Sequence, residues 1–177
     1  LSAIVAREVD RAGLHGLGSS NQPTGVAATS GIGSVAGGTN GLAPTWVHIT
    51  QLEREVAVDN ADDGKLAYIT NPKVRYKLKN TYRNATYGDI PVWADTKEQP
   101  LNGYPTKVST QVSSALTKGS SSGVCSAIFF GNWAEQCSEN NKVKKKFFFR
   151  GRTIILKPIG SNSAIRGANI DNRRPDV

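Results

Sequence analysis

Glycine is concentrated between Val9 and Gly41, and this stretch limits what the chain can fold into. The residues before it have the apolar spacing of a helix over residues 2–15. Four apolar side chains lie near one face of that helix: Ile4, Val5, Val9 and Leu14. Gly16 and Gly18 end the helix, because glycine readily takes the positive φ of a helix terminus. A turn over residues 21–25 follows, and residues 26–44 form a long connector.

A second helix is predicted over residues 45–58, after Pro44. Thr45 is its expected N-cap, since a threonine oxygen can accept a backbone N–H of the first turn. One stripe holds the apolar side chains: Trp46, Ile49, Leu52 and Val56. Glu53, Arg54 and Glu55 fall largely off that stripe, which predicts an amphipathic helix with one face in the core.

A short strand over residues 66–70 is expected to lead into a third helix. Asn71-Pro72 is a strong helix start, with a capping asparagine and proline at the first helical position. Val74 and Leu78 face the core in this pattern. The other face carries four cations: Lys73, Arg75, Lys77 and Lys79. They suggest phosphate binding, but a solvated face is the favoured interpretation.

The second half of the chain reads as strands and loops. Residues 91–94 and 104–109 have strand patterns and are joined by a turn at residues 100–103. Residues 113–123 are predicted to be a Ser/Gly-rich loop. Residues 124–131 are the most apolar segment and are expected to form the central strand of a sheet.

The positive charge of the chain belongs to its end. The 177 residues carry a formal net charge of +8, with 38% hydrophobic residues and a mean hydropathy of −0.36. Residues 137–177 hold three acids and ten bases: Lys142, Lys144, Lys145, Lys146, Arg150, Arg152, Lys157, Arg166, Arg173 and Arg174. No apolar run reaches the roughly 18 residues that span a bilayer.

Ordered motifs over residues 1–135 resemble the C-terminal portion of the major capsid proteins of tailed bacteriophages. The motifs are Asp10-Arg11-Ala12, a glycine-rich turn at Gly16 to Ser20, Asn21 to Gly25, Thr29-Ser30-Gly31-Ile32-Gly33, Pro44-Thr45-Trp46, Tyr68 to Pro72, Leu101-Asn102-Gly103-Tyr104-Pro105 and Phe130-Gly131-Asn132-Trp133. Their common order and spacing are more specific than any single glycine motif.

The resemblance implies an α+β phage capsid fold. Residues 1–44 would be the end of the spine helix and a connector, remnants of the peripheral domain, with the family's N-terminal arm and extended loop upstream of them. Residues 45–135 would be the axial domain, a small mixed sheet flanked by helices. Residues 136–177 would be a divergent basic tail.

The resemblance also implies a structural shell subunit and no enzyme. Its partners would be other copies in pentamers and hexamers, with DNA enclosed non-specifically and no membrane or small-molecule substrate. The expected location is the virion, and the host cytoplasm before assembly. An encapsulin-like nanocompartment shell, which encloses enzymes, is an alternative with the same fold. Three loops are candidate subunit contacts, because function concentrates on loops held by a rigid scaffold: residues 60–64, 97–103 and 113–123.

No catalytic, cofactor-binding or metal-binding residue is predicted. His15 and His48 lie in different elements and are expected to be surface or helix-end residues. Asp59, Asp62 and Asp63 lack the spacing of a calcium loop. Residues 31–36 spell a dinucleotide motif without the strand and helix that it needs. Residues 119–123 lack the Gly-Lys-Ser/Thr end of a P-loop.

Cysteine chemistry is not expected either. Cys125 and Cys137 have no metal-like spacing, and two cysteines are too few for a disulfide framework. Cys125 lies in an apolar run and is expected to be a small buried hydrophobe. A reducing compartment fits this usage, with one optional disulfide left open.

The family pattern stops after Gln136, and two explanations compete. One is a remodelled end, and the other is a degenerate prophage gene whose reading frame shifted near that codon. The loss of pattern and the sudden charge favour the shift. Either way, residues 137–177 are expected to be a poorly packed appendage with one strand at residues 153–156.

A rival functional class is a nucleic-acid-binding module. Its support is Lys144-Lys145-Lys146 beside Phe147-Phe148-Phe149, followed by Arg150 and Arg152. Cations neutralise phosphates and aromatic rings stack on bases. A solvated basic tail is the favoured interpretation, since blocks of like charge usually are solvated.

Overall fold

The computed structural model describes residues 2–84, 86, 90–133 and 151–156. Its elements in chain order are α1 (Ser2–His15), the 3-10 helix η1 (Val26–Ala28), α2 (Trp46–Val58), β1 (Leu66–Thr70), α3 (Pro72–Lys79), β2 (Thr106–Val108), β3 (Leu116–Lys118), β4 (Ser121–Asn132) and β5 (Gly151–Leu156). The predicted helices at 2–15 and 45–58 and the strand at 66–70 are therefore confirmed.

The sheet is mixed and centred on β4. Four strands lie in the order β2-β1-β4-β3, and β5 also pairs with β4. β1 is parallel to β2 and antiparallel to β4, so Tyr68 lies opposite Thr106 on one side and Phe130 on the other. β3 and β5 are both antiparallel to β4. The predicted α+β class and the central position of the apolar strand are confirmed.

Successive side chains of β4 supply two separate cores. Ile128 and Phe130 belong to the larger one, together with buried residues of α2 and α3. Ala127 and Phe129 belong to the smaller one, with Leu14 at the end of α1. A strand buried on both faces needs apolar residues at consecutive positions, which explains the unbroken apolar run of β4.

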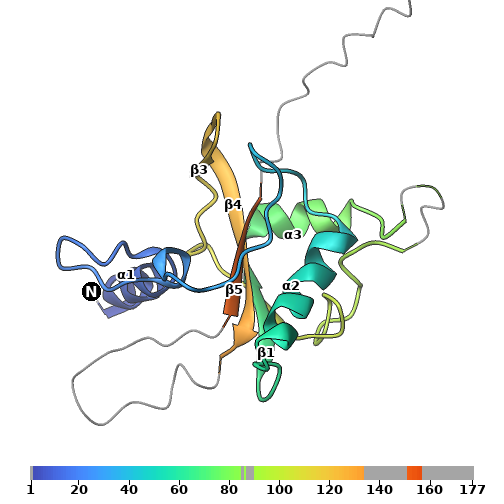
Figure 1. Cartoon of the computed structure of the whole chain (residues 1–177), viewed down its shortest axis with the longest axis horizontal. Helices are drawn as coiled ribbons and strands as arrows, with labels where there is room; N and C mark the ends of the chain where they lie inside the picture. Colours follow the sequence, from blue (N-terminus) through green and yellow to red (C-terminus); the bar gives the residue numbers. More distant parts are fainter. Residues whose placement is uncertain (1, 85, 87–89, 134–150, 157–177) are drawn as a thin grey trace, which may run out of the picture.

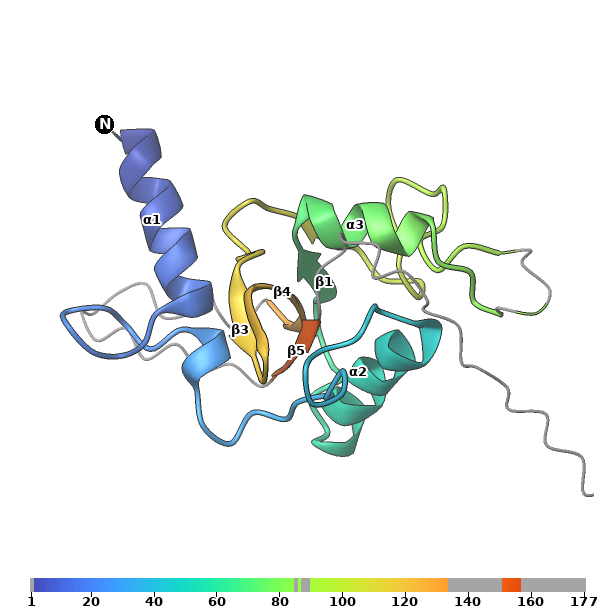
Figure 2. The same ribbon diagram turned by 90° about the horizontal axis from the view of Figure 1, so that it is seen from above.

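The helices are divided between the two faces of the sheet. Figure 1 shows α2 and α3 on one side and α1 on the other. The connector after α1 crosses between them, because Val26 belongs to the smaller core and Val35 to the larger one. From above, α2 and α3 lie along the same face of the sheet, and α1 projects away from it (Figure 2). The N-terminal part of α1 therefore has little contact with the body, and only Ala12, Gly13 and Leu14 of this helix are buried.

Local sequence signals account for the starts of α2 and α3. Thr45 is the N-cap of α2, and its backbone N–H donates to Nδ1 of His48 at 3.2 Å. Asn71 is the N-cap of α3, and its Oδ1 accepts the N–H of Val74 at 2.9 Å. Both capping predictions are confirmed, as is burial of the predicted core residues: Ile49, Leu52, Val56, Val74 and Leu78.

The strand predicted at residues 91–94 is wrong. The backbone N–H groups of residues 92, 93 and 94 donate to the carbonyls of Thr81, Leu78 and Pro100, respectively. Since these acceptors lie in three different places, the segment forms isolated bridges and no ladder. Its apolar residues are buried against α3 and the turn at 100–103. A short apolar run of this kind has the same sequence pattern as a strand.

The loop predicted at residues 113–123 is also wrong, because this segment is a β-hairpin. β3 and the start of β4 pair antiparallel, and Lys118 lies opposite Ser121. Gly119 makes the turn with a φ of +56°. Glycine is depleted in strands and serine favours turns, and β3 is only partly buried, so the sequence shows no clear alternation.

Part of the predicted tail joins the sheet. β5 contains the predicted strand at 153–156 and pairs antiparallel with β4 from Ser126 to Gly131. The other predictions for the tail, including those for Cys137, Lys144 to Lys146 and Phe147 to Phe149, concern residues outside the described ones.

Candidate functional site

Metal and membrane sites are the first candidates to consider. In the described residues, no group of three or more His, Cys, Asp or Glu side chains is placed to hold a metal ion. The same part of the chain has no helix of the length and apolarity needed to cross a bilayer. Cys125 is a free, fully buried thiol in β4, which agrees with its predicted role as a small hydrophobe.

His15 lies at the junction of α1 with the body. Its Nε2 accepts the backbone N–H of Ser113 at 3.0 Å, and its ring meets that of Phe129 edge-on with centroids 5.5 Å apart. Burial, and to a smaller extent the charge of Arg11, lowers the pKa of His15. A neutral imidazole with an accepting Nε2 fits a residue that joins α1 to the sheet.

His48 lies in the first turn of α2, far along the chain from His15. Its Nδ1 is 2.8 Å from the Thr45 hydroxyl and accepts the Thr45 backbone N–H. Partial burial lowers the pKa of His48. This ring completes the helix cap in the position where glutamate or glutamine more commonly stands. The sequence analysis did not predict this capping role of His48.

The two glycine motifs are parts of irregular chain. Residues 31–36 lie between η1 and α2, so the segment before them is a 3-10 helix and no strand. Residues 119–123 are the turn and first residues of the β3–β4 hairpin. Neither motif stands at the junction of a strand with a helix N-terminus, where a phosphate would be held.

The turn at residues 60–64 is fixed to the end of β4. The Asn132 side chain donates to the carbonyl of Asp63 at 2.7 Å and accepts the N–H of Lys65 at 3.2 Å. Asn60 and Gly64 have φ values of +50° and +92°. This first candidate contact loop therefore has a defined shape.

The loop at residues 97–103 is fixed to α2 through Glu53. The carboxylate accepts hydrogen bonds from Asn102 Nδ2 at 2.6 Å and from the Tyr104 hydroxyl at 2.7 Å. The hydrogen bond to Glu53 is the main cause that raises the pKa of Tyr104 to about 12, and the charge of Asp62 adds to it. Glu53 lies off the buried stripe of α2, so the pattern gave no sign of this anchoring role.

The third candidate segment, residues 113–123, is tied to two other elements. Asn71 Nδ2 donates to the carbonyls of Val112 and Ser113 at 3.4 and 3.1 Å. At the hairpin turn, Asn40 Oδ1 accepts the N–H of Ser120 at 2.9 Å, which docks the connector onto the hairpin. All three candidate segments are thus held by the scaffold, although they do not form one shared site.

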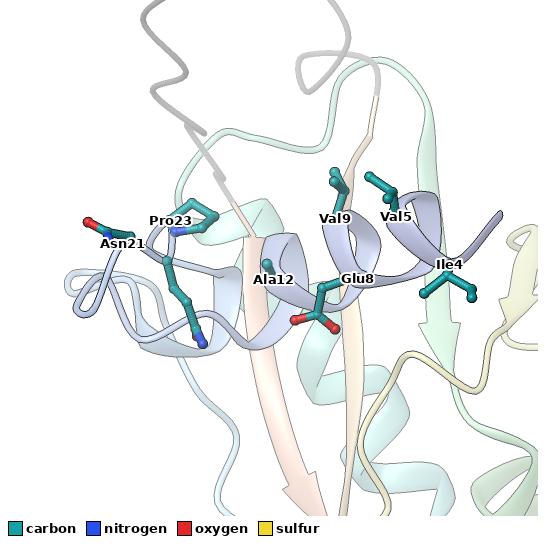
Figure 3. A pocket seen from close by; sticks show the side chains of 8 residues that line it. Ile4, Val5, Glu8, Val9, Ala12, Asn21 and Pro23 are labelled. Carbon is teal, nitrogen blue, oxygen red and sulfur yellow. The ribbon is translucent and has the colours of Figure 1, made fainter. Parts of the chain in front are cut away.

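An apolar hollow lies beside α1, where no contact was predicted. Its volume is about 700 Å³, and it is lined by Ile4, Val5, Glu8, Val9, Ala12, Asn21, Gln22 and Pro23. Figure 3 shows Val5 and Val9 on one side of α1, with Pro23 beyond Ala12. Ile4, Val5 and Val9 are 70%, 57% and 50% exposed, whereas Leu14, which was predicted near the same face, is buried in the smaller core. The sequence pattern therefore did not show that the first three residues are uncovered.

Comparison with models of protein families assigns the chain to a family. The model of a family described as the phage capsid family matches residues 1–141 of the chain. No curated protein matches the sequence. The matched range contains each described element except β5 and ends close to the boundary near residue 135 where the recognisable motifs stop.

Proposed function

Because the chain belongs to the phage capsid family, whose members are structural virion components and not enzymes, we propose that it is a shell subunit that works by assembly with further copies of itself. The family match carries this proposal, since it covers residues 1–141. In this reading, symmetric copies bury repeated surface around five-fold and six-fold axes and enclose DNA in a virion.

Two kinds of surface support assembly. The segments at 60–64, 97–103 and 113–123 are held by hydrogen bonds to Asn132, Glu53 and Asn71, respectively. Such segments lose little conformational freedom on binding, which favours tight contacts. The exposed apolar face of α1 supplies the second surface, because burying it against another copy removes apolar area from water.

We assign residues 45–135 to an axial domain and residues 1–44 to the peripheral domain. The separate cores support this division, because the buried members of the larger core other than Val35 lie within residues 45–135, whereas Leu14 and Val26 pack in the smaller one. Residues 136–177 are then a divergent tail. The pairing of β5 with β4 favours a remodelled end over a frameshift, because a shifted frame is under no selection to supply a matching strand.

Self-association of the purified chain tests the proposed function. Sedimentation velocity over a range of concentrations is expected to show species much larger than the 18.9 kDa monomer. A single monomer peak at all concentrations would contradict the proposal. If shells form, copurified DNA indicates a virion, whereas a copurified enzyme in place of DNA indicates the alternative, a nanocompartment.

The reading frame around codon 136 tests the origin of the tail. If the tail is a remodelled end, no other frame of the gene restores the family's apolar continuation, and the β5 strand resists limited proteolysis. A restored continuation in another frame would show that the tail is a frameshift product.

A further inference from the structure

The body of the chain has separated charges. The helix α3 carries four cations and no acidic residue within Pro72–Lys79. The acidic residues of the neighbouring α2 and its following turn are Glu53, Glu55, Asp59, Asp62 and Asp63. The net charge of residues 1–136 is small, but its positive charges are concentrated on α3.

The buried stripe of α3 divides its cations into two pairs. Val74 and Leu78 are 1% and 0% exposed and define the stripe. With 100° between successive residues, Arg75 and Lys79 lie on one flank of it and Lys73 and Lys77 on the other. Each pair therefore carries two positive charges on the same helix, but the two pairs face different surroundings.

The Arg75 flank borders a hollow of about 460 Å³, called here the basic hollow. It is lined by Arg75, Lys79, Trp93, Ala94, Asp95, Thr96, Lys97, Pro100, Thr106 and Val108. Among the residues that the structure describes, Arg75, Lys79 and Lys97 form no ion pair. Three cations from two separate segments thus converge on one concave surface that holds a single acid in its lining, Asp95.

We propose that the basic hollow binds the phosphate backbone of duplex DNA without sequence preference. The inference rests on the proposed function for the identity of the polyanion, which would be the enclosed DNA. Arg75 and Lys79 are about 6 Å apart along the helix axis, so both side chains can contact phosphates of one DNA strand. The hollow side of α3 then faces the interior of the shell.

The lining favours backbone contacts over base contacts. Trp93 is only 6% exposed, so its ring offers no platform on which an unpaired base could stack. Thr96 adds a hydroxyl group that can donate to a phosphate oxygen, whereas the Thr106 hydroxyl already donates to the carbonyl of Tyr104 at 3.3 Å. Cations with hydroxyls and no accessible aromatic face are typical of sequence-independent duplex binding.

Matched triple variants of the full chain test the proposal. The first removes the hollow cations by Arg75→Ala, Lys79→Ala and Lys97→Ala. The control removes Lys73, Lys77 and Lys107 by the same change to alanine. Lys107 is a suitable member because it is exposed, while its neighbours Thr106 and Val108 line the hollow, so its side chain lies on the opposite face of β2. Both variants keep the basic tail, whose contribution to binding cancels in the comparison.

The measurement is fluorescence anisotropy of a labelled random-sequence duplex of about 30 base pairs, titrated with protein between about 50 and 200 mM salt. The plot of log K against log salt has a negative slope, and each lost phosphate contact reduces its magnitude by about 0.9. In the hollow variant the magnitude of the slope is therefore expected to fall by roughly 2 to 3, and the affinity at low salt by at least tenfold. In the control variant the magnitude of the slope is expected to fall by less than about 1.

Equal losses in the two variants, or no DNA binding by the unmodified chain, would overturn the proposal. So would a hollow variant that binds DNA normally but sediments differently, because the hollow would then be a contact between copies. DNA binding and particle formation are separate readouts. Shells without binding at the hollow would refute this inference alone, and DNA binding by a permanent monomer would refute the proposed function alone.

Discussion

Asn71 joins the start of α3 to the segment before β3 through one buried side chain. Its Oδ1 caps α3, and its Nδ2 donates to two carbonyls in the segment before β3. Asn71→Ala is expected to lower the free energy of unfolding by roughly 2 to 3 kcal/mol, because the cap is lost and buried carbonyls are left without their donor. Urea unfolding followed by tryptophan fluorescence measures the change.

Asn80→Ala is the matched control for that substitution. Asn80 is the exposed C-cap residue of the same helix, and its Nδ2 donates only to the carbonyl of Tyr76 at 2.9 Å. Its loss is expected to cost less than about 1 kcal/mol, since solvent replaces an exposed hydrogen bond. Similar costs for both variants would show that the buried contacts of Asn71 are unimportant.

His15 is expected to make stability depend on pH. Burial lowers its pKa in the folded protein below the value in the unfolded chain. The stabilising effect of the neutral ring is therefore complete above about pH 6.5 and is lost as the pH falls through the folded pKa. Protonation also removes Nε2 as an acceptor for the N–H of Ser113.

The measurement compares unmodified chain with His15→Gln between about pH 7.5 and 5. Glutamine keeps an accepting oxygen and does not titrate, so the variant is expected to lose less unfolding free energy on acidification. His48 titrates in both proteins and its contribution cancels. Parallel pH curves for the two proteins would contradict the assignment to His15.

The β3–β4 hairpin depends on a close approach of the connector to its turn. A Cβ at Gly119 would lie 2.2 Å from Asn40 Oδ1 and 2.6 Å from the Thr39 carbonyl oxygen, whereas a Cβ at Gly123 would meet nothing within 4 Å. Both glycines have positive φ, +56° and +65°. A substitution at either position is therefore strained by the positive φ, but only a side chain at Gly119 would collide with the connector.

Gly119→Ala is therefore expected to destabilise the chain by at least 1 kcal/mol more than Gly123→Ala, which carries only the cost of about 1 kcal/mol for alanine at positive φ. Hydrogen exchange should show faster exchange around residues 39–41 in the first variant alone. Equal stability of the two variants would mean that the connector does not dock on this turn.

Elements with a strong local signal could be predicted from the sequence. The spacing of Ile49, Leu52 and Val56 and the Asn71-Pro72 cap specify α2 and α3, and the apolar run specifies β4. These signals act within a few residues, so sequence inspection is sufficient for them.

Features that depend on distant partners could not be predicted. The segment at 91–94 looks like a strand but donates to three separate acceptors. The hairpin at 113–123 has the serine and glycine content of a loop. It is held by contacts from the connector and from Asn71, which are distant in the sequence. Glu53 likewise shows its role only when Asn102 and Tyr104 are placed beside it. The exposed face of α1 has the same pattern as a buried one.

The exposed face of α1 is expected to contribute to assembly of the whole molecule. Val5→Glu with Val9→Glu places two charges on a surface that another copy would cover. Burying one exposed valine contributes roughly 1.5 kcal/mol, so the association constant is expected to fall at least tenfold. Sedimentation velocity at matched concentrations measures the change.

Val47→Glu is the control, because Val47 is 59% exposed near the start of α2, lies in none of the candidate contact segments and does not line the apolar hollow beside α1. It is expected to leave self-association within about twofold, since it adds one charge outside the contact. Equal weakening by both changes would point to a general effect of charge and would remove α1 from the contact.

Electron microscopy of the purified full chain tests the shell-subunit assignment most directly. Negative-stain class averages at concentrations where large species sediment are expected to show rings or closed shells whose capsomers have five-fold and six-fold symmetry. Those particles should become rarer with the paired α1 substitutions and not with Val47→Glu. Isolated monomers or irregular aggregates, without any symmetric particle at any concentration, would contradict the account.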